Sequence, residues 1–242
     1  DRSNRTTEAI IDGGLKHRFT SQQKAPLSMP DFNKHRVQKN DKVNLSKTET
    51  DGKKIEKNRD ECAALFKTVR SELIELQAKL YAEGKQKLLV VFQAMDAGGK
   101  DGTTRSVFEG ANPQGVEVTS FKRPTEAELA HDFLWRVHKA VPASGMIGVF
   151  NRSHYEDVLV VRVHNIVPET VWQPRYEMIN DFEEMLTASD TRIIKFFLHI
   201  SKNEQKQRFQ ERIDVPAKRW KFDPADLEKR KSWDDYQKAF ED

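Results

Sequence analysis

The strongest constraint on the fold is a glycine-rich segment, Met95–Thr104 (MDAGGKDGTT), which follows a continuous apolar run, Leu88–Phe92. An uninterrupted apolar run bounded by charges is typical of a strand buried on both faces. Small, flexible residues between such a strand and a helix present backbone N–H groups and a helix N-terminus to an anion. The segment therefore predicts a phosphate-binding loop in an α/β fold. The alternative is a tight turn that happens to contain a lysine.

The segment departs from the usual Walker A pattern, G-x-x-x-x-G-K-S/T, at two positions. Gly99 and Lys100 fit, whereas Ala94 replaces the first glycine and Asp101 replaces the hydroxyl residue that binds Mg²⁺. Asp96 adds a carboxylate to a phosphate site, which is costly unless a cation lies between the two anions. Asp96 therefore indicates a Mg²⁺ site. Asp101 is either catalytic or a first-turn residue favoured by the helix dipole.

Apolar runs and helical periodicities alternate along the chain from residue 59 onward. We expect strands at 88–92, 116–121, 146–150 and 192–200, and helices at 59–80, 104–109, 125–137 and 175–186. The helix at 125–137 begins with a capping box formed by Thr125 and Glu128. Strands separated by helices predict a parallel sheet with helices on both faces. Residues 1–58 show little periodicity and are expected to form an extended arm.

Composition narrows the class of protein. No apolar run approaches the roughly 20 residues needed to cross a bilayer, so no membrane partner is expected. Cys62 is the single cysteine, which precludes an intrachain disulfide and favours a cytoplasmic protein. The net charge of +3 conceals a basic start, because residues 1–59 hold 14 Lys and Arg against 8 Asp and Glu. This arm either steers a polyanion or wraps the domain, and the basic and aromatic pattern of a nucleic-acid binder is missing.

A polar cluster, Asn151–Asp157 (NRSHYED), follows the third expected strand. Ligands of open α/β sheets bind beyond the carboxyl ends of the strands. We therefore expect Arg152 to point into the same crevice as Lys100 and to offset charge on a transferred phosphoryl group. Glu156 is a second candidate ligand for a metal or a ribose. The intervening His and Tyr are expected to pack or to orient their neighbours.

A charged helix follows the fourth expected strand and carries Lys202, Arg208 and Arg212. The two arginines are four residues apart on one helix face, as in a lid that delivers cations to a phosphate chain. Taken alone, the helix is better interpreted as a salt-bridged surface helix, because Glu204 and Glu211 lie nearby. Cations that converge from separate strand ends favour the lid; the further cations are Arg105, Lys122 and Arg123.

Five motifs resemble those of the family-2 polyphosphate kinases. They are 91–103 (VFQAMDAGGKDGT), 112–115 (NPQG), 119–122 (TSFK), 150–158 (FNRSHYEDV) and 196–202 (FFLHISK). The resemblance runs from about Arg59 to Asp242, with the motifs in family order. It implies a P-loop kinase core like that of thymidylate kinase at 59–242, with a helical lid at about 201–231, preceded by the arm at 1–58.

The resemblance also implies an activity: phosphoryl transfer between inorganic polyphosphate and nucleoside mono- or diphosphates (AMP, ADP, ATP). Mg²⁺ is the implied cofactor, with Mn²⁺ as an alternative, and the implied assembly is a homo-oligomer, a dimer or tetramer. By position, Asp96, Lys100, Arg152 and Arg208 are catalytic, and Asp96 and Glu156 hold the metal. The implied phosphate- and nucleotide-binding residues are Ala97, Gly98, Gly99, Asp101, Gly102, Thr103 and Glu156. The implied polyphosphate-binding residues are Arg105, Lys122, Arg123, Lys202 and Arg212.

Two other functions stay open at this point. An ATP-dependent nucleoside monophosphate kinase would need the glycine and hydroxyl that Ala94 and Asp101 replace. A non-catalytic polyanion-binding module is favoured if the Asp and Arg side chains do not converge. Gly98 stands where the family often has Ala, and we expect it to loosen the loop without removing function. The final residues, 233–242, are expected to be helical.

Overall fold

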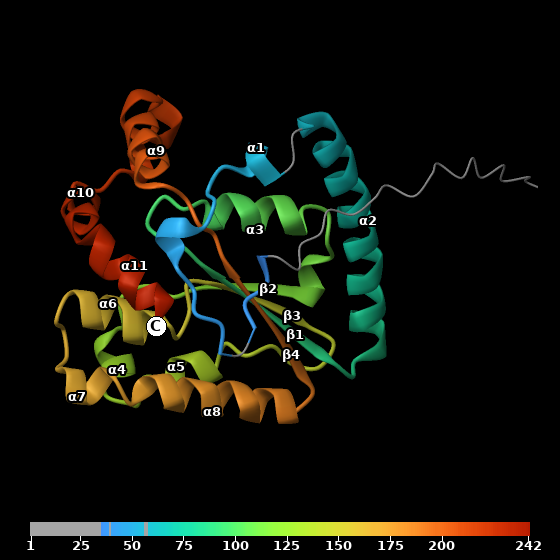
Figure 1. The fold of residues 1–242 in the computed structure, drawn as a ribbon. Coiled ribbons are helices and arrows are strands. Elements are labelled where there is room, and N and C mark those ends of the chain that lie inside the picture. The colour runs from blue at the N-terminus through green and yellow to red at the C-terminus, as the bar shows by residue number, and fades with distance from the viewer. Residues whose placement is uncertain (1–34, 39, 56–57) are drawn as a thin grey trace, which may run out of the picture. The chain divides into compact units, whose positions relative to one another are not determined.

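A computed structural model of the chain describes residues 35–38, 40–55 and 58–242. The first 34 residues of the expected arm lie outside the described residues. Four strands form one parallel sheet in the order β2-β3-β1-β4 (Figure 1). The strands are β1 (Lys87–Gln93), β2 (Val116–Ser120), β3 (Ile147–Asn151) and β4 (Thr191–Phe197). The predicted parallel sheet is confirmed, and all four strands lie where the apolar runs predicted them.

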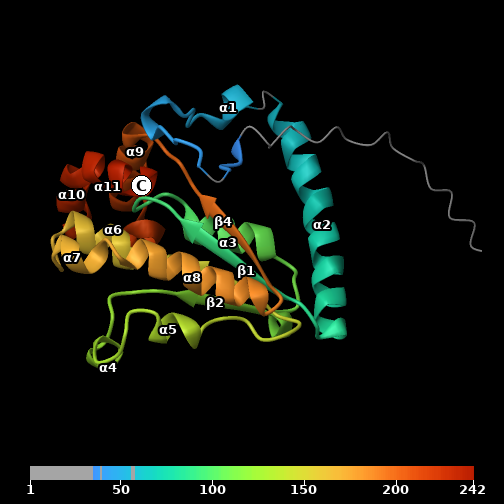
Figure 2. The same ribbon diagram turned by 60° about the horizontal axis from the view of Figure 1, so that its bottom comes forward.

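Helices cover both faces of this sheet, as predicted (Figure 1 and Figure 2). One face carries α2 (Arg59–Glu83) and α3 (Lys100–Phe108), and the other carries α5 (Trp135–His138) and α8 (Arg175–Ala188). Alternate residues of β1 supply both sides. Val90 points to the α2 and α3 side, where the partly buried Leu80 and Phe108 pack against its cluster. No helix in the described residues is long and apolar enough to span a membrane.

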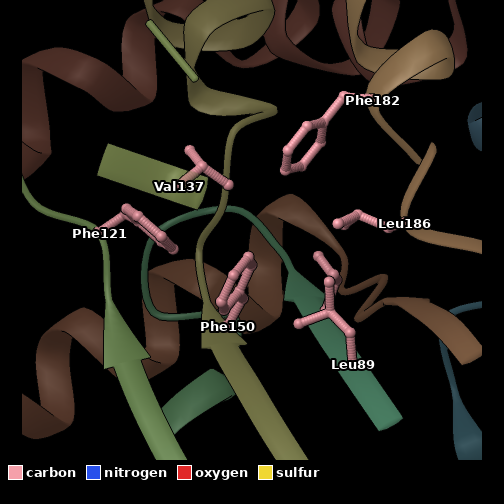
Figure 3. Close-up of a cluster of buried hydrophobic side chains, with 7 residues drawn as sticks. Leu89, Phe121, Val137, Phe150, Phe182 and Leu186 are labelled. Atoms are coloured by element: carbon pink, nitrogen blue, oxygen red, sulfur yellow. The ribbon is translucent and has the colours of Figure 1, made fainter. Parts of the chain in front are cut away.

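The core on the α5 and α8 side is one apolar cluster (Figure 3). Leu89 and Val91 of β1 join Phe150 of β3, whose ring meets Phe121 edge-on with centroids 4.9 Å apart. The helices contribute Val137, Phe182 and Leu186. Burying one such side chain contributes about 1.5–3 kcal/mol, so this cluster fixes β1 and β3 side by side. The carboxyl ends of these two strands carry the site described below.

The remaining elements complete the described chain. They are η2 (Leu45–Lys47), α1 (Gly52–Ile55), η3 (Pro113–Gly115), α4 (Glu126–Leu129), α6 (Glu156–Val163), α7 (Glu169–Trp172), α9 (Lys202–Asp214), η4 (Pro216–Lys221), α10 (Ala225–Lys229), η5 (Arg230–Ser232) and α11 (Trp233–Glu241). Residues 201–232, from α9 to η5, are called the basic segment below. Figure 1 shows α9, α10 and α11 at the end of the sheet where the strands finish.

Two expected helices differ from the structure. The helix after the glycine-rich segment begins at Lys100, four residues earlier than expected, because Gly99 takes a left-handed conformation (φ +101°) that starts the helix. The single helix expected at 125–137 is wrong: α4 and α5 are separate. The capping box of α4 is present. The side chain of Asp132 then accepts the N–H of Leu134, a turn that competes with continuation of the helix.

The long helix α2 is bounded as expected but packs less than its apolar stripe suggests. The side chain of Asn58 caps its first turn, and Gly84 ends it with φ +61°. Phe66 is nevertheless 41% exposed and Leu76 is 60% exposed. Gln77 is the buried residue of this helix, and its side-chain oxygen Oε1 accepts the N–H of Asn112 at 3.1 Å.

Candidate active site

The glycine loop, residues 94–99, joins β1 to α3 at the carboxyl end of the sheet. Ala97 (φ +58°) and Gly99 (φ +101°) both adopt left-handed backbone, and the N–H of Gly98 donates to the carbonyl of Met95 at 2.9 Å. A Cβ on Gly98 would lie 2.4 Å from the Cβ of Ala94 and 2.7 Å from the carbonyl of Met95. In this loop conformation the lack of a side chain at Gly98 lets the loop close against Ala94, and the expectation that Gly98 loosens the loop without removing function stays a prediction.

Lys100 lies folded over this loop. It is 8% exposed, and its Nζ donates to the carbonyls of Ala94 at 2.9 Å and Met95 at 3.4 Å. Burial lowers the pKa of Lys100, and the nearby charge of Arg152 lowers it further, although Asp96 opposes the shift. A desolvated ammonium that contacts only carbonyl dipoles gains from an arriving anion, so this position suits a phosphate ligand.

Asp96 and Arg152 form an ion pair between the ends of β1 and β3. Nη2 of Arg152 donates to Oδ1 of Asp96 at 2.9 Å. The backbone of Arg152 is fixed as well, because its φ is +63° and its N–H donates to the carbonyl of Phe92 at 3.1 Å. Burial raises the pKa of Asp96, but Arg152 and Lys229 outweigh burial and leave that pKa below its usual value. Asp96 is therefore a carboxylate at neutral pH.

Glu156 opens α6 beside this pair. Burial raises the pKa of Glu156, while the charges of Arg152 and Lys100 oppose the rise. Burial raises the pKa of Tyr236, and the charges of Glu156 and Asp96 raise it further, so this residue of α11 lies near the same site. Sequence reasoning missed Tyr236 because nothing in its local pattern distinguishes it from a core aromatic residue.

The carboxylates of Asp96 and Glu156 can serve one divalent cation. The described residues contain no group of three or more His, Cys, Asp or Glu side chains that could hold a metal by themselves. Mg²⁺ commonly binds through one or two carboxylates, with phosphate oxygens and waters completing its shell. Two carboxylates next to a candidate phosphate loop therefore fit a metal that arrives with a phosphate substrate.

The helix α9 lies against the glycine loop through two polar side chains. Nη1 of Arg208 donates to the carbonyl of Ala97 at 3.0 Å, and its Nε pairs with Glu204 at 2.7 Å. One turn earlier, Nε2 of the buried Gln205 donates to the carbonyl of Asp96 at 2.9 Å. Arg208 thus reaches the loop as expected, and Gln205 is a loop contact that the sequence did not reveal.

Two lysines of the basic segment approach the loop carboxylates. Nζ of Lys229 lies 3.5 Å from Oδ2 of Asp96, and Nζ of Lys221 lies 3.5 Å from Oδ2 of Asp101. Oδ1 of Asp101 also accepts Nδ2 of Asn151 at 2.5 Å, and this hydrogen bond, above the cost of burial, lowers the pKa of Asp101. Both lysines lie in a highly charged stretch of the sequence. No periodicity distinguishes them there as site residues, because their positions depend on the turns of η4 and α10.

The other predicted cations do not reach the loop. In the described part of the chain, the side chains of four of them are exposed and make no hydrogen bond or ion pair; these are Arg105, Lys122, Arg123 and Lys202. Arg212 pairs with Asp226 at 3.2 Å and donates to the carbonyl of Lys221, so it braces the basic segment internally. Binding of polyphosphate by these five side chains stays a prediction.

The His and Tyr of the polar cluster have the packing role expected of them. His154 is fully buried, and its Nε2 lies 3.2 Å from Oε1 of Glu183 on α8. The hydroxyl of Tyr155 donates to the same oxygen at 2.8 Å, and Lys195 of β4 donates to the other at 2.6 Å. Burial alone would raise the pKa of Glu183, but these partners lower it to about 2. Glu183 thus anchors the turn between Arg152 and Glu156.

Known proteins are similar to this chain in sequence. A family model described as Polyphosphate kinase 2 matches residues 55–242. The AMP/ADP-polyphosphate phosphotransferase of Meiothermus ruber is 56% identical over 209 residues, covering 86% of this chain and 78% of that protein. The ADP-polyphosphate phosphotransferase of Rhodopseudomonas palustris is 48% identical over 218 residues, covering 85% and 75%.

A solved structure is similar as well. The crystal structure of polyphosphate kinase 2 from Arthrobacter aurescens TC1 superposes with a TM-score of 0.81 at 44% identity, covering 85% of this chain and 74% of that one. This likeness confirms the P-loop kinase fold predicted for the chain.

Proposed function

The chain belongs to the polyphosphate kinase 2 family, and from that premise we propose that it transfers a phosphoryl group between inorganic polyphosphate and AMP or ADP. One observation carries the proposal: Asp96, Lys100 and Arg152 converge where β1 and β3 end, and Arg208 reaches the same loop from α9. Two of these residues come from one strand–loop–helix unit and two from distant parts of the chain. A surface that only binds polyanions has no need of a carboxylate among its cations.

The loop and Lys100 bind the phosphates in this proposal. The first N–H groups of α3 have no partner within the helix and point toward the loop, which favours an anion there. The ammonium of Lys100 turns from the carbonyls of Ala94 and Met95 to a phosphate oxygen, and this needs only side-chain rotation. In-line transfer requires positioning and neutralisation of charge more than covalent chemistry, so these groups supply its principal needs.

Arg152 and Arg208 offset the negative charge that spreads over the phosphoryl oxygens in the transition state. Asp96, with Glu156 beside it, would hold Mg²⁺, or Mn²⁺ in its place, and the cation would supply positive charge that offsets the charge of the phosphate groups. Asp96 also fixes the direction of the Arg152 guanidinium through their 2.9 Å hydrogen bond. Residues 201–232 act as a lid, because Arg208 contacts the loop from that segment.

An ATP-dependent nucleoside monophosphate kinase fits this site less well. Its loop would place a hydroxyl where Asp101 stands, and Asp101 is instead tied to Asn151 and Lys221. We also propose that the chain works as a homo-oligomer in the cytoplasm. The exposed apolar side chains of α2, including Phe66 and Leu76, offer surface for such contacts. Light scattering coupled to size-exclusion chromatography measures the assembly directly.

One assay tests the proposed reaction. Phosphorus NMR follows the protein with Mg²⁺, polyphosphate and either AMP or ADP, without added ATP. Growth of β- or γ-phosphate signals as the internal polyphosphate signal falls is the expected result. Phosphorylation of AMP that requires ATP instead would establish the monophosphate kinase, and binding of polyphosphate without any turnover would establish the polyanion-binding module.

A further inference from the structure

Both carboxylate oxygens of Asp96 are engaged by cations. Arg152 holds Oδ1 at 2.9 Å, and Lys229, from α10 of the basic segment, lies 3.5 Å from Oδ2. Nζ of Lys229 also pairs with Asp226 at 3.1 Å, and its side chain is 37% exposed. The carboxylate proposed to hold the metal therefore already has an ammonium group at one of its two oxygens.

We propose that Lys229 competes with the divalent cation for Asp96 and, once displaced, binds the phosphate chain of the substrate. This inference rests on the proposed phosphoryl transfer at this site. It makes Lys229 a binding residue of the reaction, in addition to those that the motifs indicated. It also gives one side chain two opposite effects, because the same ammonium weakens binding of the metal alone and strengthens binding of phosphate.

Lys229 is the exchangeable partner, whereas Arg152 is the fixed one. The backbone of Arg152 is held by its hydrogen bond to Phe92, and its planar guanidinium lies at the shorter distance from Asp96. A lysine carries its charge on a flexible four-carbon stem with three rotatable donors, so it can change partners at small cost. When Lys229 gives up its ion pair with Asp96, it keeps its ion pair with Asp226, so the ammonium still has a partner.

Electrostatics set the direction of the exchange. A divalent cation on Oδ2 of Asp96 and the ammonium of Lys229 would repel each other at close range, so both do not share that oxygen. A phosphate chain on the glycine loop brings several negative charges beside the metal. A lysine binds phosphate as a point charge without strict geometry, so a short swing of the side chain suffices. When metal and phosphate are both bound, the negative charge of the phosphate chain balances the positive charges of the metal and of the displaced Lys229. Either ligand bound alone would leave part of this charge unbalanced.

The test separates the two effects in the full chain. Lys229→Met keeps the stem and removes the charge, and Lys231→Met is the matched control, because Lys231 is 73% exposed and pairs with Glu228. Electron paramagnetic resonance measures binding of Mn²⁺ without phosphate, and calorimetry measures binding of tripolyphosphate without metal. Lys229→Met is expected to bind Mn²⁺ about three- to fivefold more tightly, the value of a partly exposed ion pair, and to bind tripolyphosphate more weakly.

A second variant keeps the inference open to refutation if Lys229→Met folds poorly. Asp226→Asn removes the charge that Asp226 offers to Lys229 and, on its other oxygen, to Arg212. With that charge gone, the lysine should hold Asp96 more firmly and Mn²⁺ should bind more weakly. Unchanged or weaker Mn²⁺ binding in folded Lys229→Met would overturn the inference, as would equal tightening in Lys231→Met. Turnover of polyphosphate with ADP by the wild-type chain is measured first, so a failure of the proposed function is seen there, separately from any result of the variants.

Discussion

The glycine loop and the basic segment above it are held in place by different forces. The loop is shaped by its own backbone, since Gly98 closes against Ala94 and Gly99 starts α3 from a left-handed conformation. The basic segment touches the loop through polar side chains, among them Arg208 and Lys229. A bound phosphate chain would leave the first kind of force unchanged but would alter every charge on which the second depends.

Apolar packing anchors the basic segment just outside its two ends. Ile200 precedes α9 and Trp233 follows η5, and both pack in one cluster with Met95 of the loop. Between these anchors, contact with the loop is made by charges and hydrogen bonds. A segment fixed at both ends and polar between them can shift as a unit without unfolding, which is the property required of a lid. We therefore expect the glycine loop to stay rigid and the basic segment above it to shift when phosphate binds. Variants in each of the two regions test this expectation.

The largest effect is expected on the loop side. Lys100→Ala removes the ammonium buried over the loop, and we expect a loss of kcat of about 10³-fold or more, because no other side chain can take its place. The thermal midpoint should change little, since the lysine itself is desolvated without a carboxylate at hydrogen-bond distance. Phosphorus NMR measures turnover and calorimetry measures stability. The exposed Lys79 of α2, replaced by Ala, is the matched control, and near-normal turnover in Lys100→Ala would refute the assignment of the site.

Removal of a positive charge from the basic segment is expected to have the second largest effect on turnover. Arg208→Ala should lower kcat by about 10³-fold, as for arginines that stabilise transferred phosphoryl groups. Its affinity for nucleotide should change far less, because the loop that binds phosphate keeps its shape. Arg208→Lys should recover only a small part, because an ammonium cannot reproduce the guanidinium fork. Stopped-flow single turnovers measure the chemical step, and a loss confined to affinity would contradict this role.

The third test makes the loop itself move. Gly98→Ala places a methyl group 2.4 Å from the Cβ of Ala94, so the loop must shift at a cost of about 1–3 kcal/mol. Turnover should fall about 10- to 100-fold, because a shift of about 1 Å at the phosphates misaligns the reacting groups. The double variant Ala94→Gly with Gly98→Ala should restore only part of the loss, because the added Cβ would still lie 2.7 Å from the carbonyl of Met95. Denaturant unfolding and steady-state kinetics of the three variants measure the coupling, and an additive double variant would show that the two positions do not interact.

More of the glycine loop than of the basic segment could be predicted from the sequence. Sequence neighbours build the loop, so a buried strand followed by small residues and Lys100 was sufficient to place it. The parallel sheet followed for the same reason, from four apolar runs separated by helices. The contacts of Lys229 and Gln205 with Asp96 could not be predicted, because each joins residues more than 100 positions apart in the chain. The break between α4 and α5 also escaped, since one Asp132 side chain outweighs the helical pattern around it.

The smallest effect on turnover is expected beneath the site, where Glu183 holds His154 and Tyr155. Its pKa of about 2 lies below the ordinary 4.5, so its ionised form stabilises the fold above pH 4.5, and that contribution is lost as the pH falls from 4.5 toward 2. Glu183→Gln should therefore cost about 3 kcal/mol at pH 7 and progressively less in acid, because a tenfold change in proton affinity between the folded and unfolded chain corresponds to about 1.4 kcal/mol. Thermal unfolding from pH 7 to pH 3 measures this, with the exposed neighbour Glu184→Gln as control.

Turnover at pH 7 should fall less than about threefold in Glu183→Gln, since the amide still fills the space beneath the turn that leads to Glu156. A constant stability difference across that pH range would show that packing, not charge, is what Glu183 supplies. A large loss of kcat without loss of stability would mean that the turn between Arg152 and Glu156 moves freely once its anchor is weakened. The activity of the site would then depend on a third region, the turn held by Glu183, in addition to the glycine loop and the basic segment.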